Sequence, residues 1–96
     1  MVMSIKSVIV SALAAATIGV SAVPVLAYTV DVQGGTWNYG VGSTYVWSYY
    51  SHNSRTHSAA VKGAYSASSG WISPGTEARA SAQKSYFGNQ SFYNVK

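Results

Sequence analysis

The segment Thr44-Tyr45-Val46-Trp47-Ser48-Tyr49-Tyr50 alternates large rings with other side chains at a period of two. In an extended strand, residues two apart point to the same side of the sheet, so Tyr45, Trp47 and Tyr49 share one face. Aromatic and β-branched residues also favour strands over helices. The segment therefore predicts a β-strand over residues 44–51 and indicates an all-β chain.

The same alternation recurs later in the chain. In residues 56–62, Ala59 and Val61 fall on one face and polar side chains on the other. In residues 78–86, alanines alternate with the polar set Arg79, Ser81, Gln83 and Ser85. We predict six short strands, at residues 35–39, 44–51, 56–62, 64–68, 78–87 and 90–95.

Turn-forming residues separate these strands. Ser51–Arg55 is a polar turn, and Ser73-Pro74-Gly75-Thr76 suits a type II turn with proline second and glycine third. Gly88-Asn89 lies between two aromatic runs and predicts a two-residue hairpin. Asp31–Gly35 is predicted to be a flexible lead-in. Short strands at this spacing are typical of a small antiparallel sandwich or barrel.

The first residues have the order of a secretory signal. Lys6 gives a basic start, the apolar run Val8–Val20 follows, and Val25-Leu26-Ala27 is a small-residue cleavage site. We predict a signal peptide at residues 1–27 and a mature domain at residues 28–96, with cleavage after Ala22 as the fallback. A membrane anchor is the alternative, because the uncharged run is long enough to span a bilayer.

Composition limits how the mature domain is stabilised. The chain has no cysteine, whereas small exported domains usually rely on disulfides. Its 3 Trp, 8 Tyr and 2 Phe all lie from residue 28 onward, and we expect most of them, including Trp37, Trp47 and Trp71, in the core. Scarce aliphatic residues would suit a disordered chain. Abundant rings and a low net charge favour a folded one.

The charge and the reactive side chains limit the classes of function that the chain can have. From residue 28 onward the formal charge is +3, which favours anionic surfaces, and no Lys/Arg cluster indicates a nucleic-acid site. The acids of the chain are Asp31 and Glu77, so a catalytic carboxylate pair is not expected. His52 and His57 are too few for a zinc site. We predict no enzymatic activity, no metal and no cofactor.

A series of short motifs runs through the mature part. They are Gly35-Thr36-Trp37, Tyr39-Gly40, Ser48-Tyr49-Tyr50-Ser51-His52, Thr56-His57-Ser58-Ala59-Ala60-Val61 and Ser91-Phe92-Tyr93. Together they resemble the lactococcin 972 family of secreted bacteriocins. The resemblance covers essentially all of residues 28–96. It is weak over Gly63–Ala80 beyond Trp71, and the terminal aromatic residue associated with the family is absent.

The resemblance implies a fold and an activity. The fold is a β-sandwich of two three-stranded antiparallel sheets, in agreement with the six strands expected from periodicity. The activity is that of a secreted, extracellular bacteriocin. It inhibits related bacteria by binding the cell-wall precursor lipid II and blocking septal wall synthesis without pores. A producer of such a protein would hold a dedicated immunity protein.

Lipid II offers a pyrophosphate and sugars for recognition. Arg55 is the best candidate for the pyrophosphate, because a guanidinium matches its geometry. His52 and His57 flank it, and Tyr49 and Tyr50 offer rings for sugar stacking. These five residues form the predicted ligand-binding set. The alternatives are a solvated turn for Arg55 and His52, and a hydrogen-bonding role at a strand start for His57.

Two other function classes stay open. One is a secreted module that binds another anionic envelope component. The other is a self-associating surface protein, a homo-oligomer, because exposed tyrosine-rich strands invite edge pairing. Killing of related strains separates the bacteriocin from the self-associating protein. Antagonism of that killing by added lipid II separates it from the other binding module.

Processing gives the first testable prediction. The small residues at the 25–27 site predict that the protein in culture supernatant begins at Tyr28, which an intact-mass measurement checks. Finding uncleaved Met1–Lys96 in the membrane fraction would contradict both the cleavage site and secretion.

Overall fold

The computed structural model describes residues 4–9 and 26–96, and within them the chain forms strands and no helix. The described part thus holds no helix of the length and apolarity needed to cross a bilayer. The strands are β1 (Ser4–Ile9), β2 (Leu26–Val32), β3 (Gly35–Val41), β4 (Tyr45–Ser51), β5 (His57–Lys62), β6 (Ser66–Ser68), β7 (Ala78–Gln83) and β8 (Gln90–Val95).

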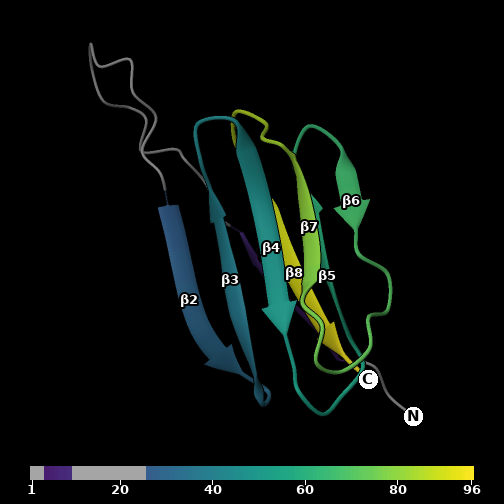
Figure 1. Ribbon diagram of the computed structural model, residues 1–96. Helices are drawn as coiled ribbons and strands as arrows, with labels where there is room; N and C mark the ends of the chain where they lie inside the picture. Colours follow the sequence, from purple (N-terminus) through teal and green to yellow (C-terminus); the bar gives the residue numbers. More distant parts are fainter. Residues whose placement is uncertain (1–3, 10–25) are drawn as a thin grey trace.

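The strands form two antiparallel sheets that pack face to face (Figure 1). One has the order β2-β3-β4-β7 and lies in front in the figure; the other has the order β1-β8-β5-β6. The predicted fold class, an all-β antiparallel sandwich, is confirmed. The prediction of three strands in each sheet is wrong, because β1 and β2 each add a strand at one edge.

The six predicted strands are present as β3 to β8. Their ends move by a few residues, and the largest change is in β7, which ends at Gln83 instead of residue 87. The predicted turn at Ser73–Thr76 is also present. The amide of Thr76 donates to the Ser73 carbonyl, and Gly75 has a φ of 89°, the left-handed conformation that favours glycine there.

The predicted flexible lead-in, Asp31–Gly35, is instead part of a hairpin. Asp31 and Val32 end β2, which pairs with β3 along its whole length. Gln33 and Gly34 form the two-residue turn with φ values of 51° and 86°, as a type I′ turn requires. The physical reason is the position of β2. It begins inside the predicted signal peptide and ends inside the predicted lead-in, so its period-two pattern is divided between the two segments.

The predicted hairpin at Gly88-Asn89 is wrong as well. The flanking strands β7 and β8 lie in different sheets, so this segment is a crossover connection. Gly88 does have a positive φ of 75°, as a turn signal suggests. The buried Asn89 side chain closes the loop on itself, accepting from the Ser85 amide (2.8 Å) and donating to the Ser85 carbonyl (3.0 Å).

The core between the sheets combines a few rings with small aliphatic side chains. Four rings are buried, and Trp37 stacks on Tyr39 with centroids 4.1 Å apart. The expectation that most rings are in the core is wrong: Tyr86, for example, is 90% exposed. Valine and alanine fill the space between the buried rings. The buried apolar residues are Trp37, Tyr39, Val41, Val46, Tyr50, Ala59, Val61, Ala78, Ala80, Ala82, Tyr93 and Val95.

Two buried serines tie the sheets together. The Ser48 hydroxyl of β4 donates to the Phe92 carbonyl of β8 (2.7 Å), and the Ser91 hydroxyl of β8 donates to the Trp47 carbonyl of β4 (3.0 Å). Ser48 also accepts from the Trp37 indole N–H (2.8 Å). Both hydroxyls are hydrogen-bonded, and these bonds offset the cost of removing the hydroxyls from water.

Most of the predicted signal peptide lies outside the described residues. Of its described parts, Ser4–Ile9 pairs with β8 as the edge strand β1, and Leu26 and Ala27 begin β2. Cleavage after Ala27 would therefore free one edge of β8 and shorten β2 by two residues.

The buried Tyr50 gives an alkaline stability prediction. Its hydroxyl donates to the Val32 carbonyl, and burial, followed by the nearby Tyr93, raises the Tyr50 pKa to about 12. The unfolded tyrosine ionises near pH 10, so stability present below pH 10 is lost as the pH rises towards 12. The full loss is about 3 kcal/mol, which urea unfolding at stepped pH values measures.

The matched comparison is Tyr50→Phe against Tyr86→Phe. The first variant should show a weaker fall in stability above pH 10, whereas the second removes the hydroxyl of a ring that is 90% exposed and should behave as the wild type. The same alkaline slope in all three proteins would refute the assignment to Tyr50.

Candidate functional site

Three of the five predicted ligand-binding residues lie inside the fold. His52 is buried, with its Nδ1 accepting from the Ser54 and Arg55 amides (3.1 and 3.0 Å). Its Nε2 therefore carries the hydrogen and donates to the Gln33 carbonyl (3.0 Å). His52 thus connects the 51–56 loop to the β2–β3 turn, and both ring nitrogens are engaged.

His57 is fully buried at the start of β5 and also contacts main-chain oxygens. Its Nδ1 lies 2.8 Å from the Arg55 carbonyl and its Nε2 lies 2.7 Å from the Thr76 carbonyl. Carbonyl oxygens only accept, so both contacts are hydrogen bonds only when both ring nitrogens carry hydrogen. His57 fastens the 73–76 turn to β5, and Tyr50 packs edge-on against it, with ring centroids 5.7 Å apart.

Arg55 is exposed on the loop between β4 and β5. Its Nε donates to the main-chain oxygen of Lys96 (2.8 Å), and the Lys96 ammonium lies 5.1 Å from the centre of the Trp71 ring. Trp71 is 40% exposed, so its predicted place in the core is wrong. The structure therefore groups Arg55 with Lys96 and Trp71. We call these three residues the Arg55 cluster.

Tyr49 lies on a different surface, the outer face of the β2-β3-β4-β7 sheet. Along β4, Val46, Ser48 and Tyr50 are buried, while the alternate residues point outwards. Strand pairing places Trp47 opposite Ser81, and Tyr49 between Asn38 and Arg79. We call this surface the outer aromatic face. Its residues are Thr29, Asn38, Tyr45, Trp47, Tyr49, Arg79, Ser81 and Gln83.

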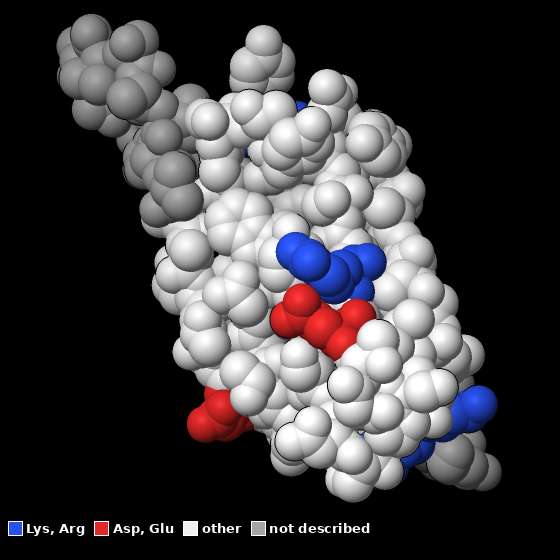
Figure 2. Space-filling model, in the orientation of Figure 1, with Lys and Arg blue, Asp and Glu red and all other residues white. Residues whose placement is uncertain are grey.

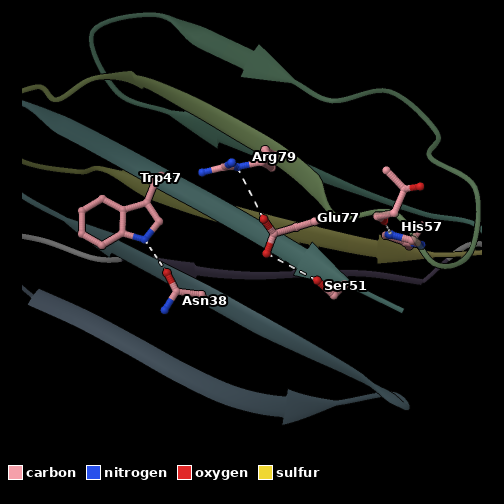
Figure 3. A network of polar contacts seen from close by, with 7 residues as sticks. Asn38, Trp47, Ser51, His57, Glu77 and Arg79 are labelled. Carbon is pink, nitrogen blue, oxygen red and sulfur yellow. Dashed lines mark hydrogen bonds and ion pairs between the residues drawn. The ribbon is translucent and has the colours of Figure 1, made fainter. Parts of the chain in front are cut away.

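Trp47 is held flat against the sheet, and its predicted place in the core is wrong. Its indole N–H donates to the Asn38 side-chain oxygen (2.8 Å; Figure 3). The Asn38 amide in turn donates to the Thr29 hydroxyl (2.7 Å). Gly40 leaves room for the ring, because a Cβ there would lie 2.7 Å from Trp47 Cζ2. Trp47 is half-buried, so part of its ring meets solvent.

A second row of contacts fixes Tyr49. The Arg79 guanidinium lies 4.3 Å from the centre of the Tyr49 ring, a cation–π distance. Arg79 Nε lies 3.5 Å from Glu77 Oε1, and the Ser51 hydroxyl donates to Glu77 Oε2 (3.4 Å) (Figure 3). The charge of Arg79 is therefore balanced by Glu77, which lies next to the face.

A groove opens beside these rings at the end of the β3–β4 hairpin. Its volume is about 570 Å³, and its walls are Tyr45, Trp47, Tyr49 and Ser81 together with the turn at residues 42–44. Small-molecule sites in proteins have volumes of about 300–1,000 Å³. The groove is thus large enough to hold part of a ligand.

Sequence patterns place Arg79 on the polar face of its strand, but they do not single out Trp47, Asn38 or Arg79 as residues of a site. The signal was present in β7, where Arg79, Ser81 and Gln83 alternate with buried alanines. These polar residues pair with Tyr49, Trp47 and Tyr45. Directly paired residues of neighbouring strands lie on the same face of the sheet, so these rings share the solvent-facing side of β7. The described residues contain no group of three or more side chains suited to a metal ion.

Comparison with known proteins gives one match. Residues 33–93 fit the family described as Bacteriocin (Lactococcin_972). No curated protein and no solved structure matches the chain. The matched segment runs from the β2–β3 turn into β8, so it contains both the Arg55 cluster's loop and most of the outer aromatic face.

His57 generates the prediction for this site. His57→Ala leaves the Arg55 and Thr76 carbonyls without their partner and opens a cavity. The free energy of unfolding should fall by about 3 kcal/mol or more, as measured by urea denaturation. Asn53→Ala, on the same loop but exposed, is the control and should stay within about 0.5 kcal/mol of wild type. A loss in His57→Ala as small as that of the control would contradict the structural role.

Proposed function

We propose that this chain, which belongs to the lactococcin 972 family of bacteriocins, is secreted and inhibits related bacteria by binding lipid II and blocking septal wall synthesis. The observation that carries the proposal is the family match over residues 33–93, which covers β3 to β7 and most of β8. A producing cell would then protect itself with a dedicated immunity protein.

The Arg55 cluster supplies the chemistry for the pyrophosphate of lipid II. Arg55 uses Nε to hold the Lys96 main-chain oxygen, which fixes the plane of the guanidinium and leaves its terminal amino groups for a ligand. The Lys96 ammonium adds a second positive charge beside the exposed Trp71 ring. Two cations at a loop suit a doubly charged anion, and the loop can meet it without opening the core.

A self-associating surface protein without killing activity is the second candidate. It is favoured by β2, which forms the edge of its sheet and carries Tyr28 and Val30 with 45% and 37% of their surfaces exposed. An edge strand with exposed apolar side chains invites pairing with another copy. Sedimentation of the purified protein over a concentration series distinguishes this candidate from a monomeric bacteriocin.

Arg55 gives the prediction that tests the proposed mechanism. Arg55→Ala should keep the fold and weaken lipid II binding by about tenfold or more, because charge-assisted hydrogen bonds are lost. Arg55→Lys should recover only part of this affinity, since the planar fork is lost. Lys62→Ala removes the same charge from an exposed position in β5 and is the matched control. Calorimetric titration with lipid II and growth inhibition of related strains are the measurements.

The outcomes separate the mechanism from the residue. Leakage of an impermeant dye from liposomes lacking lipid II would overturn the mechanism. Unchanged inhibition by a folded Arg55→Ala protein would overturn only the assignment of Arg55.

A further inference from the structure

We propose that the outer aromatic face binds a neutral oligosaccharide, whose sugar rings stack along Tyr45, Trp47 and Tyr49. This surface is separate from the Arg55 cluster, and its ligand needs neither a pyrophosphate nor a lipid. The inference therefore goes beyond lipid II recognition and does not depend on it.

The spacing of the rings suits a chain of sugars. Alternate residues of a strand lie about 7 Å apart, so the three side chains form a row along β4. Tyr45 is 52% exposed, and Trp47 and Tyr49 are each partly exposed. The apolar face of a pyranose ring packs on an aromatic ring, and its hydroxyls then point sideways.

The protein holds two of these rings in place before any ligand arrives. The Asn38 side chain fixes the indole of Trp47, and the Arg79 guanidinium packs on one face of the Tyr49 ring, so a sugar can stack only on the other face. Both contacts come from neighbouring strands of a rigid sheet. Fixed rings lose little conformational freedom when they bind, so more of the stacking energy appears as affinity.

Polar side chains flank the row on both sides. Ser81 and Gln83 lie on β7 directly opposite Trp47 and Tyr45, while Asn38 and Thr29 follow on β3 and β2. Hydroxyl and amide groups both donate and accept hydrogen bonds, as sugar hydroxyls do. The groove of about 570 Å³ beside Trp47 provides a concave site at one end of the row.

The charge of the face selects a neutral ligand. Arg79 is paired with Glu77, and Asp31 adds a further negative charge on β2. In Figure 2 a basic and an acidic patch touch at the centre of this face, and most of the surface around them is uncharged. An anionic ligand would require cations aimed at the rings. In the described structure Arg55 and Lys96 lie in the separate Arg55 cluster, and the Lys84 ammonium lies 5.8 Å from the centre of the Tyr86 ring.

The test uses soluble N-acetylglucosamine oligomers as the probe and the purified full-length mature protein. Calorimetric titration should show saturable binding. Trp47→Ala should weaken the binding about tenfold or more, and Trp47→Phe, which keeps an aromatic ring, should lose less. Tyr49→Ala provides a second variant on the same row. Tyr65→Ala removes an exposed aromatic ring outside both proposed sites and should bind as the wild type.

Three results would overturn the inference. They are the absence of saturable binding, equal affinity in a folded Trp47→Ala protein, and a preference for a polyanionic saccharide over neutral oligomers. Arg55→Ala should bind the oligomers with unchanged affinity. Oligomer binding without lipid II binding would refute the proposed function alone, and the reverse result would refute this inference alone.

Discussion

The pair of serine hydrogen bonds between β4 and β8 is the constraint on which the sandwich depends. Ser48 and Ser91 are fully buried, and each donates to a main-chain carbonyl of the opposite sheet. Because serine is small, the two strands approach closely enough for these bonds, and the large rings must pack beside them. Tyr93 lies there, with centroids 4.8 Å from both Trp37 and Tyr50. The inward direction of Ser48 also turns Trp47 and Tyr49 outwards.

Much of the fold could be predicted from the sequence, because β3 to β8 carry their own period-two patterns. The assignment of strands to sheets could not. β7 and β8 are neighbours in the chain, and Gly88-Asn89 between them fits a hairpin as well as a crossover. Local turn chemistry does not distinguish the two. The choice depends on burying Ser91 and Tyr93 against the opposite sheet, which is a property of the whole core.

The site was harder to predict for a related reason. Alternation shows that Tyr45, Trp47 and Tyr49 share a face, but it does not show which face is inside. Counting rings favours the wrong side, because the buried side of β4 holds Val46, Ser48 and a single ring, Tyr50. The pairing of these residues with the polar side of β7 shows that their face is the outer one. That register depends on residues far apart in the sequence. The polar sequence around His52 likewise suggests an exposed ring, but the ring is buried and both of its nitrogens are hydrogen-bonded within the fold.

The position of β8 has a consequence for the order of events during synthesis. This strand follows all the others in the described chain, yet it lies inside its sheet between β1 and β5. It supplies Ser91 to the contact between the sheets and Tyr93 to the core. Before residues 90–95 exist, β5 has the three-residue β6 as its sheet neighbour, and β4 lacks the serine contact with β8. The contact between the sheets and the part of the core around Tyr93 can therefore form only after the last strand of the described chain has been made.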